Sequence, residues 1–303
     1  MLNRSSPLYV FTILSTLIMS PAQAGQRAFV ASYGSDTNSC GPVTPCRTFA
    51  KAVTVVDPNG EVVALDSSGF GSVTLTQSVS LTAAPGAYVG ITAFPSTNGV
   101  TIAANVNVVL RGISINGLGG NTGISMSGNS NLSIENCVIS NFSTLGQFGI
   151  FVNSAASVRI VDTLVRDNDT GIKLQGGSVT DISGSKFLGN NTAIFATSTA
   201  SPFTSVVISD SIVTSGGTGI KATSSGSGNS RTNMIRSSVT NNLEGITSSA
   251  SAGTAPITFS DSMITGNVVG YNKGTGGTLV SLVNNTITDN GSNTGPLTPL
   301  ALQ

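Results

Sequence analysis

The stretch LSIENCVISN at residues 132–141 has six counterparts further along the chain. They read VRIVDTLVRDN (158–168), VTDISGSKFLGN (179–190), VVISDSIV (206–213), TNMIRSSVTNN (232–242), ITFSDSMITGN (257–267) and VSLVNNTITDN (280–290). Their central apolar residues recur every 22 to 26 residues, and Ile115 extends the series towards the N-terminus. These residues are Ile139, Val165, Phe187, Val213, Val239, Ile264 and Ile287. A fixed period in this range predicts a solenoid.

The local pattern inside each repeat indicates which solenoid this is. Apolar and polar residues alternate over short stretches, as in strands, and no repeat has helical periodicity. Each repeat ends with a second mark, the dipeptide Gly-Ile or a near equivalent. The first residues of these dipeptides are Gly123, Gly149, Gly171, Ala193, Gly219, Gly245 and Gly270. About three strands per turn would then stack in parallel, about 4.8 Å apart, with right-handed connections. The sequence therefore predicts an all-β fold, a right-handed parallel β-helix, whose coils occupy residues 91–290.

Aligned coils place polar residues in columns that we interpret as structural. An asparagine column holds Asn168, Asn190, Gly216, Asn242, Asn267 and Asn290, and asparagine suits both left-handed turns and amide ladders. A hydroxyl column holds Cys137, Thr163, Ser185, Ser211, Ser237, Ser262 and Asn285. A nucleophilic serine would need a neighbouring base, and the chain has no histidine. We therefore expect hydrogen bonds along this column and a buried thiol at Cys137.

A third column holds Asn136, Asp162, Gly184, Asp210, Arg236, Asp261 and Asn284. Because Arg236 falls between two aspartates, an ion ladder is expected there, although exposed pairs contribute only about 0–1 kcal/mol each. We interpret this column as a solvated turn.

The N-terminus has the features of a secretory signal over residues 1–24. Arg4 is basic, residues 8–19 are apolar, and Ala22-Gln23-Ala24 matches a cleavage site after Ala24. The apolar run is too short to span a bilayer, and no later segment could do so. We therefore expect a secreted, periplasmic or cell-surface protein without a membrane span.

Composition narrows the expected partners. Without Arg4 the chain keeps 12 of its 13 basic residues against 13 acidic ones, a formal net charge of −1. A near-neutral chain gives no support for nucleic-acid binding, which needs a basic patch. Charged residues are only 9% of the chain, as in an exported all-β protein. We expect one elongated domain that acts as a monomer.

Cys40 and Cys46 flank the short loop 41–45. In an oxidising compartment we expect them to form a disulfide, because a single pair without histidine makes a poor metal site.

Residues 25–90 are expected to cap the solenoid and to form its first coils. A solenoid must shield the core and strand edge of its first coil. Strands are predicted at 27–30, 61–65 and 72–76, and a short helix with one apolar face at 48–56, ended by the turn at 57–60. Residues 291–303 form a C-terminal tail that caps the last coil or lacks fixed structure.

This N-terminal region resembles a known group. Phe29-Val30, the run from Gly34 to Asn38, the run PCRTFAKAV at 45–53, and Asn59-Gly60 are similar to the first module of bacterial pectin-lyase-like β-helix proteins. With the repeats, the resemblance covers nearly the whole chain after residue 24. It implies the β-helix fold. Its members include polysaccharide lyases, hydrolases, epimerases and esterases, as well as adhesins, so the fold alone assigns no function.

The resemblance implies that an active site would lie outside one sheet, with carboxylates that often hold Ca²⁺ and an Arg or Lys that takes a proton. Arg111, Glu135, Arg159 and Asp181 come from four successive coils and should lie near one face; they are the catalytic candidates. None of them matches a catalytic motif of the group.

A second charged group lies at one coil edge. Asp167, Asp169 and Lys173 could bind Ca²⁺ or a sugar acid, although a solvated turn is the commoner interpretation. We find no other cofactor signal. The chain has no Trp and only four Tyr, so it lacks the usual sugar-stacking platforms.

Three functional hypotheses follow. The first is a non-catalytic exported β-helix that binds a polysaccharide or a cell-surface glycan. The second is a polysaccharide lyase or a related carbohydrate-active enzyme, such as a glycoside hydrolase, in which Arg159 is essential. The third is a passenger-like component of a surface assembly. The uncharged Ser/Gly/Thr-rich loops favour the first.

Overall fold

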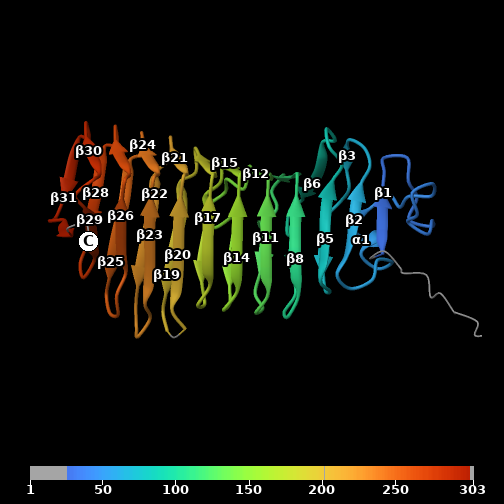
Figure 1. The fold of residues 1–303 in the computed structure, drawn as a ribbon, viewed down its shortest axis with the longest axis horizontal. Coiled ribbons are helices and arrows are strands. Elements are labelled where there is room, and N and C mark those ends of the chain that lie inside the picture. The colour runs from blue at the N-terminus through green and yellow to red at the C-terminus, as the bar shows by residue number, and fades with distance from the viewer. Residues whose placement is uncertain (1–25, 201, 301–303) are drawn as a thin grey trace, which may run out of the picture.

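The computed structural model describes residues 26–200 and 202–300. Three parallel sheets wind into one elongated, right-handed β-helix, as the repeat predicts. Figure 1 shows the coils side by side along the long axis, from the blue N-terminal end to the red C-terminal end. Each coil adds one strand to each sheet, so residues one coil apart in sequence are hydrogen-bonded neighbours.

The three sheets are named A, B and C here, in the order in which a coil visits them. Sheet A consists of β1 (Arg27–Val30), β2 (Gly60–Ala64), β5 (Val79–Ala83), β8 (Asn107–Arg111), β11 (Asn131–Glu135), β14 (Ser157–Val161), β17 (Val179–Ser183), β20 (Thr204–Ser209), β23 (Ser230–Ile235), β26 (Pro256–Ser260), β29 (Thr278–Leu282) and β32 (Thr298–Leu300). Sheet B consists of β3 (Ser68–Gly69), β6 (Val89–Ala93), β9 (Ile113–Gly117), β12 (Val138–Ser140), β15 (Leu164–Arg166), β18 (Lys186–Leu188), β21 (Ile212–Thr214), β24 (Ser238–Thr240), β27 (Met263–Thr265) and β30 (Thr286–Thr288). Sheet C consists of β4 (Val73–Leu75), β7 (Asn98–Ile102), β10 (Thr122–Met126), β13 (Phe148–Asn153), β16 (Thr170–Gln175), β19 (Thr192–Ser198), β22 (Thr218–Ser224), β25 (Glu244–Ala250), β28 (Val269–Lys273) and β31 (Ser292–Thr294).

The core is built from stacked apolar columns inside the three sheets. The central residues of the repeat, from Ile115 to Ile264, form the column of sheet B and are fully buried. The isoleucine of each Gly-Ile mark forms the corresponding column of sheet C. Because successive side chains of a strand point to opposite faces, every second residue is left facing solvent. These outward residues decide what the surface can bind.

The hydroxyl column lines the turn between sheets A and B and is structural, as predicted. Each backbone N–H from Cys137 to Ser237 donates to the hydroxyl in the next coil, at N···O distances of 3.1 to 3.3 Å. Each hydroxyl from Thr163 to Ser262 donates to the carbonyl two residues earlier, at 2.7 to 2.9 Å. Both hydrogen-bonding roles of these side chains are therefore used within the stack.

The asparagine column forms a buried ladder between sheets B and C. Asn168 donates from Nδ2 to Oδ1 of Asn190 at 2.9 Å, and Asn242 donates in the same way to Asn267 at 3.1 Å. Gly216 interrupts the side-chain ladder, and its backbone N–H donates to Asn242 at 3.0 Å. The left-handed conformation expected of these asparagines is found instead one residue earlier, from Asp167 to Asp289, with φ between 53° and 67°. The asparagines themselves contribute buried amides that hydrogen-bond from coil to coil.

The glycine of the Gly-Ile mark is required by this ladder. A Cβ atom on Gly171 would lie 2.5 Å from the carbonyl oxygen of Ala193 and 3.2 Å from Cγ of Asn190. The third polar column carries a second left-handed position, from Asn136 to Asp261, with φ between 46° and 58°. Its predicted ion ladder has one pair, in which Arg236 donates to both carboxylate oxygens of Asp210 at 2.8 and 2.9 Å.

A compact cap covers the first coil. Asp36 accepts hydrogen bonds from the backbone N–H groups of Arg47 and Thr48, and Thr48 caps the helix α1 (Phe49–Ala52). Cys40 and Cys46 form the predicted disulfide. The helix is shorter than the expected 48–56, because the β-branched run from residue 53 to 56 disfavours helix and continues as turns.

The two ends of the chain differ in how far they are described. The predicted signal, residues 1–24, lies outside the described residues, and so does its cleavage site. The predicted tail contributes β31 and β32 to sheets C and A as far as Leu300. Within residues 26–200 and 202–300, no helix is long and apolar enough to cross a membrane.

Candidate functional site

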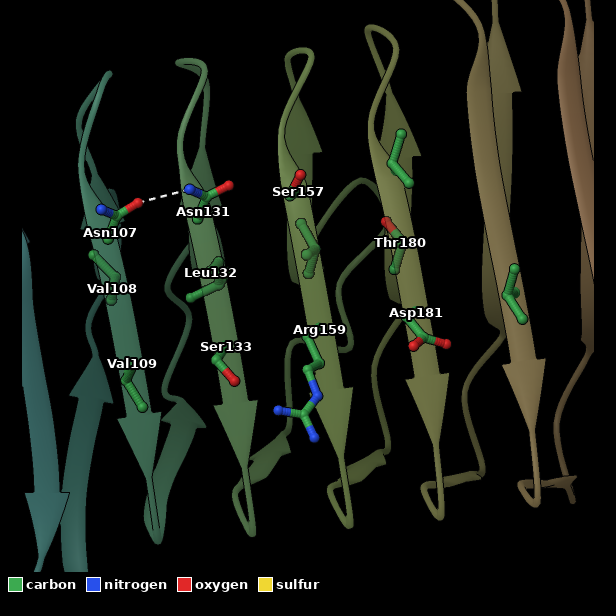
Figure 2. A pocket seen from close by; sticks show the side chains of 13 residues that line it. Asn107, Val108, Val109, Asn131, Leu132, Ser133, Ser157, Arg159, Thr180 and Asp181 are labelled. Atoms are coloured by element: carbon green, nitrogen blue, oxygen red, sulfur yellow. Dashed lines mark hydrogen bonds between the residues drawn. The ribbon is translucent and has the colours of Figure 1, made fainter.

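A shallow groove of about 860 Å³ runs across the outer face of sheet A. We call it the sheet A groove; residues of β8, β11, β14 and β17, together with Val207 of β20, line it. Figure 2 shows its residues on neighbouring strands, with a hydrogen bond from Asn131 to Asn107 at its upper end. Val179 and Val207 are exposed apolar side chains in this groove, at 57% and 39%.

The pairing register places the four catalytic candidates on this face but divides them between two columns. Arg111 pairs with Glu135, whereas Arg159 pairs with Ser133 on one side and Asp181 on the other. Arg159 and Asp181 line the groove. Arg111 and Glu135 do not; they lie two residues beyond the groove residues Val109 and Ser133 on β8 and β11. The sequence predicted a shared face, but the division depends on the strand register.

Arg111 and Glu135 form a salt bridge, with Nε of Arg111 3.0 Å from Oε2 of Glu135. Ser133 donates to the other carboxylate oxygen at 2.9 Å. Burial acts to raise the pKa of Glu135, but the hydrogen bonds from Ser133 and Arg111 and the charges of Arg111 and Arg159 together lower it below its ordinary value. Glu135 is therefore a carboxylate at neutral pH, and its two oxygens are already engaged.

Arg159 and Asp181 differ from this pair because both are exposed and neither is in an ion pair or hydrogen bond between side chains among the described residues. Arg159 contributes only its charge, which helps to lower the pKa of Glu135. The groove thus offers one guanidinium and one carboxylate that remain available to a ligand, next to an apolar floor (Figure 2).

The calcium candidates Asp167 and Asp169 lie together in a separate shallow pocket of about 410 Å³, at the turn between sheets B and C. Asp167 pairs with the adjacent Arg166, whereas Asp169 accepts from the backbone of Gly146 at 2.8 Å and from Asn191 at 3.0 Å. Over residues 26–200 and 202–300, no three His, Cys, Asp or Glu side chains are placed to hold a metal ion together. The calcium site stays a prediction.

Lys173, the third member of that predicted group, lies on the outer face of sheet C instead. It lies among the rings of Phe148, Phe151 and Phe195, and Lys221 follows in the same column. The sequence analysis missed this cluster. The signal was present, because the residues that follow four successive Gly-Ile or Ala-Ile marks alternate Phe, Lys, Phe, Lys.

Comparison with known proteins agrees with this architecture. Residues 90–235 match a family described as "Right handed beta helix region". The solved pectate lyase Pel9A is 15% identical and superposes with a TM-score of 0.67 over 89% of this chain and 78% of its own. An alginate lyase from Paenibacillus sp. str. FPU-7 is 10% identical, with a TM-score of 0.60 over 90% of this chain and 99% of its own.

At these identities the solved structures establish the fold alone. No curated protein sequence matches the chain. From its sheets, its ladders and these likenesses, the chain is a right-handed parallel β-helix protein with a pectin-lyase-like fold.

Proposed function

We propose that this protein is an exported, non-catalytic β-helix that holds a linear polysaccharide in the sheet A groove. One observation carries the proposal. Arg159 and Asp181 lie in the groove without a side-chain partner among the described residues, next to the exposed Val179 and Val207. The guanidinium and the carboxylate can bind the carboxylates and hydroxyls of a sugar, while the neighbouring valines contact the apolar faces of the sugar rings.

The charged groups in and beside the groove support binding rather than proton transfer. The guanidinium of Arg159 offers a planar set of N–H donors that suits carboxylates and other anions. Glu135 has a lowered pKa and is engaged with Arg111 and Ser133, whereas a general base works best with a pKa near the working pH. These conditions suit a fixed hydrogen-bonding surface.

The choice of ligand class is supported by the likeness to two polysaccharide lyases, whose activities belong to those proteins. The export is supported by the N-terminal sequence, which predicts a cleavable signal. The residues that line the sheet A groove come from five successive strands of sheet A, so a polymer can lie across several coils.

The test uses the chain without its predicted signal and a panel of alginate, polygalacturonate, xylan and dextran, with and without Ca²⁺. Binding is measured by affinity electrophoresis, and turnover by unsaturated-product absorbance and new reducing ends. We expect binding to at least one glycan, no product, and a loss of about tenfold in affinity for Arg159→Ala, since a charge-assisted hydrogen bond is removed.

Arg166→Ala is the matched control, because it removes the same charge from sheet B. Product that disappears in Arg159→Ala would replace the proposal with the lyase hypothesis. A folded protein that binds no glycan in the panel, or binding that is equal in the two variants, would overturn the groove as the contact site.

A further inference from the structure

The outer face of sheet C carries a column in which aromatic and basic residues alternate. Phe151, Lys173, Phe195 and Lys221 come from β13, β16, β19 and β22 and are paired in that order by the strand register. Phe148 stacks beside Phe151, with ring centroids 4.9 Å apart and an interplanar angle of 20°. We call these five residues the aromatic–lysine ladder.

The rings hold the two ammonium groups in place. Nζ of Lys173 lies 5.5 Å from the ring centroid of Phe148, 5.8 Å from that of Phe151 and 5.6 Å from that of Phe195. Nζ of Lys221 lies 5.2 Å from the ring of Phe195. Each contact of this kind contributes about 0.5–1 kcal/mol at an exposed site, so the lysines lose part of the freedom that surface lysines usually keep.

These positive charges are not neutralised by the protein. Neither lysine forms an ion pair with a carboxylate in the described part of the chain, and all five ladder residues are partly exposed. Glu244, in the next coil, is engaged with Thr247 at 2.9 Å and Asn272 at 3.2 Å. Burial against the rings lowers the pKa of Lys173, because a partly dehydrated ammonium has lost some of its water. An anion would restore the lost interactions.

A polar row runs beside the ladder, two residues further along each strand. Gln175 donates to Asn153 at 2.9 Å, and the hydroxyl of Thr223 donates to that of Thr197 at 2.8 Å. Amides and hydroxyls in this row can exchange hydrogen bonds with sugar hydroxyls. Cations and neutral polar groups therefore run in parallel along the solenoid axis.

We propose that the aromatic–lysine ladder is a binding surface for an acidic polysaccharide that runs along the solenoid axis. Lys173 and Lys221 are two coils apart, about 9.6 Å at the usual strand spacing, which is near the length of a disaccharide. They would contact acidic groups of a chain such as a polyuronate or a sulfated glycan. This surface lies on a different sheet from the sheet A groove and does not depend on its occupancy.

The chemistry of the ladder favours a glycan over other polyanions. Nucleic-acid binding neutralises many phosphates at once, and the whole chain has as many acidic as basic residues. Anchoring to an anionic bilayer needs clusters of four or more basic residues. Two cations beside a row of amides and hydroxyls suit a polymer with spaced charges and many hydroxyls.

The experiment measures affinity for polygalacturonate, dextran sulfate and neutral dextran at low and high salt. We expect binding to an acidic polymer that weakens with salt, no binding to dextran at this surface, and a loss of about tenfold for Lys173→Gln/Lys221→Gln. Phe195→Leu keeps both charges but removes the ring between them, so a smaller loss is expected.

Lys51→Gln/Lys186→Gln is the matched control, since it removes the same charge outside sheet C. Arg159→Ala separates the two proposals. If affinity for the acidic polymer falls in Arg159→Ala but not in the ladder's lysine variant, binding belongs to the sheet A groove and the ladder is overturned. The ladder is also overturned if its lysine variant binds like the wild type, or if an oligonucleotide or anionic vesicle binds through the same lysines more tightly than the glycans. A melting temperature for each variant shows that the comparison is between folded proteins.

Discussion

At the scale of single residues, the outward positions of one sheet carry the functional argument. Arg111 and Glu135 satisfy each other, whereas Arg159, one column away, remains available to a ligand. The difference arises from strand register alone, because all four charged residues lie on the same face. The binding role of Arg159 and Asp181 is a proposal, and the affinity of Arg159→Ala for glycans tests it.

Glu135 should make stability depend on acid pH. Its pKa is lowered in the folded protein, so the unfolded state binds the proton more readily. The contribution is complete above the ordinary pKa of 4.5 and is lost as the pH falls through the lower, folded value. Urea unfolding of wild type and Glu135→Gln should therefore differ at pH 7 by under about 1 kcal/mol, and should converge towards pH 3. A difference that grows on acidification would contradict the lowered pKa.

Cys137 should be chemically inert in the folded protein. Burial raises the pKa of its thiol to about 11, although hydrogen bonding with the backbone of Ile113, Glu135 and Gly112 acts in the opposite direction. We expect no reaction with a maleimide at pH 8 in buffer and complete reaction in denaturant, measured by mass spectrometry. Cys137→Ser should keep the stability within about 1 kcal/mol, since serine occupies the equivalent position in later coils. Rapid labelling of the native protein would show that the column opens.

At the scale of the element, the coil is held in register by its polar ladders. The hydroxyl and asparagine columns bond from coil to coil, and the glycine beneath each asparagine lets the backbones approach. Four buried hydroxyls, those of Thr82, Ser178, Thr180 and Thr232, have no protein partner among the described residues. A few buried hydroxyls therefore lack a hydrogen-bond partner in the described part of the protein, whereas the hydrogen bonds of the two ladders continue over most coils.

Removing one rung should be costly. Asn190→Ala would remove the Oδ1 acceptor that the side-chain amide and backbone N–H of Asn168 share, and the side-chain donor to the carbonyl of Val165. We expect a loss of about 2 kcal/mol in the free energy of unfolding, measured by chemical denaturation with circular dichroism. Asn131→Ala removes an exposed amide–amide bond and should cost under about 0.5 kcal/mol. Equal effects of the two substitutions would refute a special role for the buried ladder.

At the scale of the whole molecule, an elongated solenoid presents several independent faces. The sheet A groove and the aromatic–lysine ladder lie on different sheets and draw on different residues. Each coil contacts mainly its neighbours, so a substitution should alter the structure and stability of only a few coils. The N-terminal cap is the exception in composition, since it holds the disulfide, the helix α1 and the buried pair Phe49–Phe70.

Loss of the disulfide should loosen the N-terminal coils first. Cys40→Ala/Cys46→Ala removes the covalent link that ties the cap, and we expect the free energy of unfolding to fall by about 2 kcal/mol. Amide exchange should rise in β2 and β5 and remain unchanged in β20 and β23. A reductant should lower the stability of the wild type to that of the variant and should leave the variant unaffected. Uniform exchange along the solenoid would show that the molecule unfolds as a single cooperative unit.

The amino-acid sequence was enough to predict the period, the three-strand coil, the two buried ladders and the capped N-terminal end. The first three rest on contacts between equivalent positions of successive coils, so the periodicity of the chain is enough to reveal them. The cap does not repeat, and its local residue pattern predicts it instead. The sheet A groove and the aromatic–lysine ladder could not be predicted in the same way, because they depend on which outward residues become neighbours. Only the strand register decides that Arg111 pairs with Glu135 while Arg159 stays available. The alternation of Phe and Lys after successive Gly-Ile marks is visible in the sequence, but the tertiary structure shows that it places Lys173 among rings on sheet C. Side chains that do not repeat are placed by the tertiary structure, since no local pattern records which coil lies beside them.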